Sequence, residues 1–161
     1  MTGLRFWVGG IPVPQGSMSA FVRGRHASIV DQKAKTLHPW REWIGQVGKQ
    51  AAAQQGIEPY DEPLQVAMTF YLPRPAKHYG TGRNRYILRG DAPMFPTYKQ
   101  DVDKLARGVL DAITQGGLIK DDGQVVEMIA IKLYTVHTQD RPGGNPGVQI
   151  NIRSWKEARG L

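Results

Sequence analysis

The chain has 161 residues, of which 40% are hydrophobic and 22% are charged, a composition typical of globular rather than disordered proteins. It contains no cysteine, which excludes disulfides, thiolate catalysis and zinc sites of the usual cysteine type. Twenty-one Lys and Arg against 14 Asp and Glu give a formal net charge of +7. Such a charge favours polyanionic partners, above all nucleic acid; a protein that is basic without such a partner is the alternative.

The length fits one domain, residues 1–161, with enough chain to bury a core. No apolar run approaches the roughly 18 residues of a membrane span. The N-terminal stretch MTGLRFWVGGIPVPQGS lacks the apolar region of a signal peptide. We therefore expect a protein of the reducing cytoplasm.

The first third of the chain predicts two strands and a helix. Leu4–Gly9 is expected to be a short strand, and SAFVRGRHASIVD, residues 19–31, a second strand that could pair with it. From His38 to Gly56, apolar residues recur at helical spacing, with Pro39 in the first turn. The tryptophans of this stripe, Trp40 and Trp43, are expected in the core.

A strand from Leu64 is followed by a long basic loop, about 73–100, which is rich in Pro, Gly and Arg. Loops of this length are uncommon unless they are functional or disordered. Basic residues interleaved with aromatic ones predict phosphate contact and base stacking; a merely solvated loop is the alternative. The residues expected to bind DNA here are Arg74, Lys77, Arg83, Arg85, Lys99 and Tyr98.

The second half predicts a helix and two strands. The helix is indicated by apolar residues at three- and four-residue spacing, with Asp101 at the N-cap position and Gly116 and Gly117 after its end. Strands are expected from Val125 and from Val148. The element order indicates an α+β fold, a single mixed α/β domain with a small sheet and two main helices.

Five aspartates fall within residues 101–122 of this basic chain. Asp103 and Asp111, with Arg107 between them, share one helix face, and Asp101 lies close to Asp103. Another two, Asp121 and Asp122, lie in the turn before the next strand, and loop length does not decide near which helix end. A structural alternative exists for each part, because Asp commonly caps helices and DDG is a common turn sequence.

Together, however, these carboxylates predict a metal site. Clustered carboxylates repel one another unless a cation compensates their charge. Hard oxygen ligands suit Mg²⁺, with Mn²⁺ as an alternative. A metal held by Asp groups can activate water at a phosphodiester while Lys and Arg hold the flanking phosphates.

The segments DVDKLARGVLDAI, GG and DDGQV, with GGIPVPQGS near the N-terminus, resemble the RusA-type Holliday junction resolvases of bacteria and their phages. The strong motif covers about 25 residues, and the order of predicted elements fits the remainder. The resemblance implies a homodimeric nuclease that binds four-way DNA junctions and nicks two opposing strands in recombination and repair.

Carried over by position, the resemblance makes Asp101 and Asp103 metal-binding catalytic carboxylates, and Asp122, beside Asp121, completes the acidic site. The family's asparagine and lysine fall at Lys104 and Arg107, which are departures. Arg107 keeps the positive charge but cannot deprotonate, so a role in charge balance or DNA binding is retained. The family's proline before the first aspartate is also replaced, by Gln100. Tyr98 is a candidate wedge between bases.

Three functions compete at this point. The first is a Mg²⁺-dependent endonuclease acting on branched DNA. The second is a binding protein of the same fold that has lost catalysis through the changes at Lys104 and Arg107. The third is a basic structural protein whose aspartates are only caps and turn residues.

Overall fold

The structure is a computed structural model that describes residues 3–16, 18–23, 26–31, 34–98, 100–136 and 144–161. Its central element is a four-stranded sheet in the order β1-β6-β4-β5. The strands are β1 (Leu4–Gly9), β4 (Leu64–Leu72), β5 (Val125–Tyr134) and β6 (Gly147–Ser154). Only β4 and β5 run parallel, so the sheet is mixed and the fold is α+β, as the sequence predicts.

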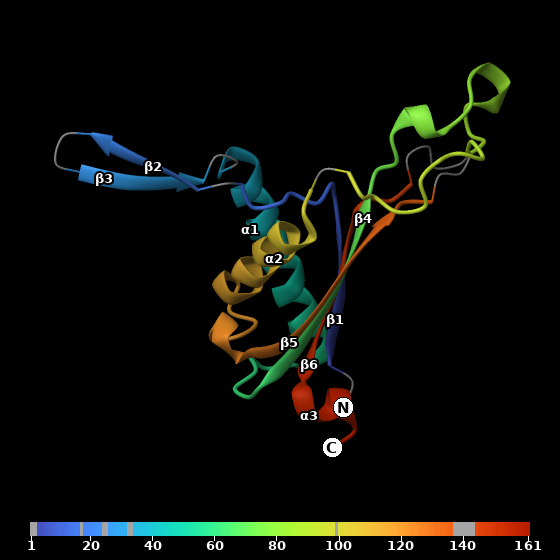
Figure 1. The fold of residues 1–161 in the computed structure, drawn as a ribbon. Coiled ribbons are helices and arrows are strands. Elements are labelled where there is room, and N and C mark those ends of the chain that lie inside the picture. Colours follow the sequence, from blue (N-terminus) through green and yellow to red (C-terminus); the bar gives the residue numbers. More distant parts are fainter. Residues whose placement is uncertain (1–2, 17, 24–25, 32–33, 99, 137–143) are drawn as a thin grey trace.

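Two long helices, α1 (Ala34–Gln55) and α2 (Val102–Gln115), lie on the same side of the sheet (Figure 1). The strands alternate in burial because one face of the sheet packs on these helices. The core between the layers is formed by apolar side chains from both helices and the sheet, including Ile44, Phe70, Leu105, Ile113 and Ile150. A short helix, α3 (Trp155–Arg159), follows β6.

The predicted second strand is a hairpin of two strands, β2 (Met18–Arg23) and β3 (His26–Asp31), which form a sheet of their own. The expectation that it pairs with β1 is wrong, because the partner of β1 is β6. Between β1 and β2 lie two prolines, Pro12 and Pro14. They have no N–H to donate to a sheet, and they favour separation of the hairpin from β1.

The helix predicted from His38 begins four residues earlier, at Ala34, so Pro39 lies inside it. Trp40 is buried in the core as expected. The expectation for Trp43 is wrong, since its side chain is 48% exposed and its Nε1 donates a 3.1 Å hydrogen bond to the Gly9 carbonyl oxygen. The buried stripe of the helix runs through Trp40 and Ile44, and Trp43 lies on its flank.

Two segments project from the end of the molecule at which α2 begins (Figure 1). One is the β2–β3 hairpin, and the other is the long loop after β4, which contains two single-turn 3₁₀ helices, η1 (Ala76–His78) and η2 (Gly82–Asn84). Among the described residues, no helix is long and apolar enough to cross a membrane.

Candidate active site

The first pair of predicted carboxylates lies at the start of α2. Asp101 occupies the N-cap position, with extended backbone angles, yet its side chain makes no capping hydrogen bond. Its carboxylate is 69% exposed, and Oδ2 lies 3.6 Å from Nζ of Lys104. Asp103 is exposed in the first helical turn. An Asp at this position ordinarily accepts a hydrogen bond from a backbone N–H. The carboxylate of Asp101 accepts no such bond, and it contacts the ammonium group of Lys104 instead.

Two buried oxygens lie on the segments that meet the start of α2. The backbone N–H of Gln15 donates to the carbonyl oxygen of Lys104 at 3.1 Å, which places the GGIPVPQGS segment beside the helix. Within the described residues, the side-chain oxygens Oε1 of Gln15 and of Gln100 are buried and have no hydrogen-bond partner. Such orphaned acceptors are costly and rare in folded proteins.

Gln100, immediately before Asp101, has a positive φ of 55°, which is uncommon for a residue other than glycine. Its carbonyl oxygen accepts a 3.0 Å hydrogen bond from Nζ of Lys132 on β5. The bond holds the entry to α2 against the far end of β5. No sequence motif indicated Lys132, because this contact joins residues that are distant in the chain.

The second pair of predicted carboxylates lies in a turn built around η3 (Asp122–Gln124). Oδ1 of Asp121 accepts a 2.7 Å bond from the N–H of Gly123, and Oε1 of Gln124 accepts from the N–H of Asp121 at 3.2 Å. Within the described residues these bonds form a capping box that commits Asp121 to the turn. Asp122 is exposed, and no described residue bonds to its carboxylate.

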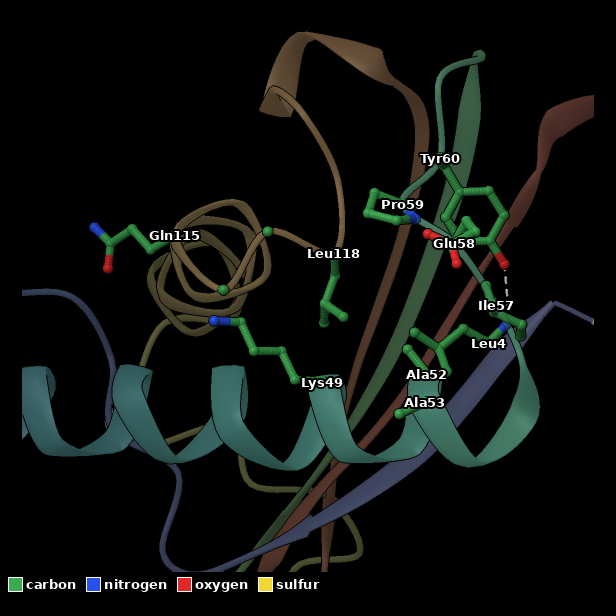
Figure 2. A pocket seen from close by; sticks show the side chains of 12 residues that line it. Leu4, Lys49, Ala52, Ala53, Ile57, Glu58, Pro59, Tyr60, Gln115 and Leu118 are labelled. Atoms are coloured by element: carbon green, nitrogen blue, oxygen red, sulfur yellow. Dashed lines mark hydrogen bonds between the residues drawn. The ribbon is translucent and has the colours of Figure 1, made fainter.

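The turn is attached to the segment around Tyr60, since Nε2 of Gln124 donates to the Tyr60 carbonyl oxygen at 3.1 Å. A pocket of about 410 Å³ lies beside this segment. Figure 2 shows Tyr60, Lys49 and Leu118 among the residues that line it. The hydroxyl of Tyr60 accepts from the N–H of Leu4 and donates to the carbonyl oxygen of Ile152, both at 3.0 Å. Burial raises the pKa of this hydroxyl above 10.0, so it remains a donor.

The two pairs of carboxylates lie at opposite ends of α2. The helix has 14 residues, and at 1.5 Å per residue it separates its ends by roughly 20 Å. Within the described residues, no three His, Asp or Glu side chains come together to hold a metal. The structure thus places Asp101 and Asp103 at the same end of α2, and Asp121 and Asp122 of the same chain lie at the other end.

Two further charged residues of α2 differ in their surroundings. Asp111 accepts a 2.6 Å bond from Arg41 on α1, which joins the two helices. Arg107 is exposed one helical turn after Asp103, a spacing at which side chains are neighbours on the helix surface. Arg107 and Lys104 therefore supply positive charge beside the first pair of carboxylates.

Arg74, which the sequence predicts to bind DNA, instead makes contacts within the long basic loop and with the sheet. One of its guanidinium nitrogens donates to the Pro93 carbonyl oxygen at 2.6 Å and lies 3.3 Å from Nδ1 of His78. The guanidinium also lies 4.2 Å from the ring centroid of Tyr134 on β5. These contacts anchor the base of the loop to the end of β5 and join Arg74 to Pro93.

The other predicted residues of the loop are on its surface. Lys77, Arg83, Arg85 and Tyr98 are exposed, and the guanidinium of Arg85 lies 4.9 Å from the ring centroid of Tyr86. Lys99 lies outside the described residues. The projecting loop therefore exposes several cations.

The donor set at the start of α2 fits a hard divalent cation. Mg²⁺ is commonly bound by one or two carboxylates, with waters and substrate phosphates completing its shell. Asp101, which has no capping bond, and its neighbour Asp103 provide such carboxylates. Two carboxylates without a phosphate are a partial shell, which leaves positions for a substrate.

Comparison with known proteins shows the family to which the chain belongs. The family model for endodeoxyribonuclease RusA matches residues 12–153, and its description indicates endodeoxyribonuclease activity. A relative from Bacillus subtilis (strain 168), named "Uncharacterized protein YqaN", is 28% identical over 153 residues, or 95% of this chain and 97% of the relative. The matched residues include α2, the DDGQV turn, β4, β5 and all of β6 except its last residue. The match leaves out β1. The chain belongs to the RusA endodeoxyribonuclease family.

Proposed function

We propose that this protein is a Mg²⁺-dependent endodeoxyribonuclease that binds four-way DNA junctions and resolves them by symmetric cleavage in DNA recombination and repair. The observation that carries the proposal is the uncapped carboxylate of Asp101 beside Asp103, at the start of a helix flanked by cations. With DNA as its substrate, the enzyme acts in the cytoplasm of a bacterium or of a phage-infected bacterium.

Asp101 and Asp103 would hold the metal, with Mn²⁺ as an alternative to Mg²⁺. When bound, the metal supplies a Lewis acid that activates water and stabilises charge at the phosphodiester. Lys104 and Arg107 hold the flanking phosphates, since each contact with a phosphate releases condensed counterions. The exposed cations of the long loop, Lys77, Arg83 and Arg85, extend this surface along the DNA.

The edge strand β5 supports a homodimer. It carries four exposed apolar side chains, Val126, Met128, Ile129 and Ile131. A long apolar edge strand invites pairing with another strand. The opposite edge, β1, exposes only Trp7 among its large apolar residues. We therefore assign the two-fold axis to the middle of β5, where one copy pairs antiparallel with the other.

This pairing would bring the separated carboxylates together. Asp122 lies three residues before the start of β5, whereas Gln100, next to Asp101, contacts Lys132 near the other end of β5. An antiparallel pair sets the start of one strand beside the end of its partner. The partner's Asp122 would then approach Asp101 and Asp103, giving two equal sites for the two cleavage points of a junction.

The test compares a labelled four-way junction with a linear duplex, each with and without Mg²⁺, for the natural protein and for Asp103→Asn. We expect paired nicks in the junction only, dependent on metal, and no cleavage by the variant. Junction binding by Asp103→Asn should be equal or stronger, because the change removes a negative charge near phosphate. Equal cleavage by the variant and the natural protein would contradict the metal assignment.

A binding protein without catalysis is the second candidate, and one observation favours it. Nζ of Lys104 lies 3.6 Å from Oδ2 of Asp101, so a cation already compensates a carboxylate that the metal would need. Under this alternative the protein binds junctions tightly but cleaves none in Mg²⁺ or Mn²⁺. Lys104→Asn, with Arg107→Lys, would then restore cleavage.

A further inference from the structure

The face of the sheet that α1 and α2 leave uncovered carries an aromatic pair. Trp7 on β1 and Tyr71 on β4 lie with ring centroids 5.6 Å apart and planes tilted by 58°. Trp7 is 40% exposed, although it lies in a regular strand of the main sheet. An exposed tryptophan backed by a second ring is a surface on which a planar group can stack.

The indole of Trp7 packs against the backbone of the neighbouring strand, β6. A Cβ built on Gly147 of β6 would lie 2.5 Å from Cζ2 of Trp7, so the indole covers the backbone at that glycine. The neighbouring Gln149 is fixed as well, because its Nε2 donates a 2.8 Å bond to the Phe6 carbonyl oxygen. The indole is therefore supported on its inner side, and its exposed surface faces outward.

These rings border a depression of about 430 Å³, within the range of ligand-binding clefts. Its described lining residues include Arg5 and Asn145, and none of them is acidic. A guanidinium suits a phosphate, and an amide can bond the edge of a base. The depression lies at the base of the long basic loop, which leaves β4 two residues after Tyr71.

A second depression at the other end of the sheet differs in charge. It measures about 630 Å³ and is lined by Glu58, Glu62 and Glu157, with no Lys or Arg among its described lining residues. The three carboxylates of this second depression repel a phosphate, whereas the guanidinium of Arg5 attracts one. The contrast in charge between the two depressions favours a polyanion at the aromatic one.

We propose that Trp7 and Tyr71, with Arg5, form a binding site for the unpaired bases of single-stranded DNA. A base stacks on Trp7 while Arg5 holds the adjacent phosphate, the combination by which proteins bind single strands without sequence preference. The site takes nucleotides that are unstacked where the strands of a branched substrate separate. The inference rests on the proposed function, and it adds a DNA-binding surface separate from the carboxylates at the start of α2.

Fluorescence anisotropy of a labelled oligothymidylate at one fixed, low salt concentration tests the site. Trp7→Leu should weaken binding about tenfold, the loss expected for one base–aromatic stack, and Trp7→Phe should restore most of it. Trp43→Leu is the matched control, because it removes a similarly exposed tryptophan from α1 and should bind as the natural protein does. Circular dichroism melting checks that each variant is folded.

Photocrosslinking gives a readout that does not depend on stability. Oligothymidylate containing 5-iododeoxyuridine is irradiated with the natural protein, and the modified peptides are identified by mass spectrometry. Crosslinks at Trp7 or Tyr71 support the site, and crosslinks confined to other residues overturn it.

Two further outcomes separate this inference from the proposed function. Normal junction binding and cleavage with no affinity for oligothymidylate would overturn the single-strand site alone. Loss of binding to every DNA would overturn both. If Trp7→Leu instead changes the oligomeric state in analytical ultracentrifugation, the face is an interface between copies of the chain, which also overturns the site.

Discussion

Two aspartates, Asp101 and Asp121, occupy N-cap positions in this chain and use them differently. Asp121 bonds the N–H of Gly123 at 2.7 Å and belongs to a capping box, whereas Asp101 makes no capping bond. The sequence alone is compatible with a capping role or a metal-binding role for each aspartate. Only the local backbone geometry separates them, because a cap requires the side-chain oxygen to meet an N–H two or three residues later.

This difference predicts opposite effects of two matched substitutions. Asp121→Ala should lower the free energy of unfolding by about 1 kcal/mol, the usual cost of losing a cap. Asp101→Ala should change that free energy much less and should abolish cleavage of a four-way junction. Urea denaturation and the junction assay measure the two quantities. A large loss of stability in Asp101→Ala would mean that this aspartate is structural.

At the scale of elements, the long loop is stabilised by a neutral histidine. Burial, followed by the charges of Arg74, Lys77 and Arg89, lowers the pKa of His78 below 6.5. Nδ1 of His78 lies 3.3 Å from a nitrogen of Arg74 that can only donate, so this imidazole nitrogen accepts. Protonation of that nitrogen would place two cations side by side.

The loop should therefore weaken in acid. Because the folded pKa lies below the unfolded value, the contribution of His78 to stability is fully present above about pH 6.5 and is lost as the pH falls through the folded pKa. An NMR titration of the imidazole should give a midpoint below 6.5, and Arg74→Gln should move that midpoint upward. A midpoint at or above 6.5 in the natural protein would contradict the packing of Arg74 on His78.

Periodicity predicted several elements well and failed where pairing was distant. The strands β4, β5 and β6 and the helix α2 follow local apolar patterns, and they occur where those patterns predict them. The sequence predicts one strand where the structure has β2 and β3, because their pairing with each other and their separation from β1 are not encoded in apolar spacing. Trp43 fits a helical stripe, yet it lies on the flank, since the sheet covers only part of the helix surface.

At the scale of the whole molecule, the proposed dimer predicts a crosslink at β5. The chain has no cysteine. A single introduced cysteine can therefore form a disulfide only with the same cysteine of the partner. Each of the positions 128–131 is changed to cysteine in turn, from Met128→Cys to Ile131→Cys, which places one thiol near the proposed two-fold axis. Facing residues of antiparallel strands have Cβ atoms about 5 Å apart there. At least one variant should form a disulfide-linked dimer under mild oxidation.

Arg5→Cys, on the other edge strand β1, is the matched control and should remain a monomer on a non-reducing gel. Crosslinked protein should retain metal-dependent junction cleavage, since the crosslink preserves the proposed pairing. Efficient crosslinking of Arg5→Cys, with none along β5, would assign the dimer to the opposite edge. The partner's Asp122 could then not reach Asp101.

The sequence by itself determined the family and the α+β class of this protein, because both rest on residue types and local spacing, as does the acidic motif within a basic chain. The tertiary structure decided how these residues are distributed. It placed Asp101 and Asp122 at opposite ends of α2, put Lys132 against Gln100, and left Trp7 exposed on the open sheet face. The physical reason is that such contacts depend on strand order and register, which join residues far apart in the chain and leave no periodic trace in its sequence.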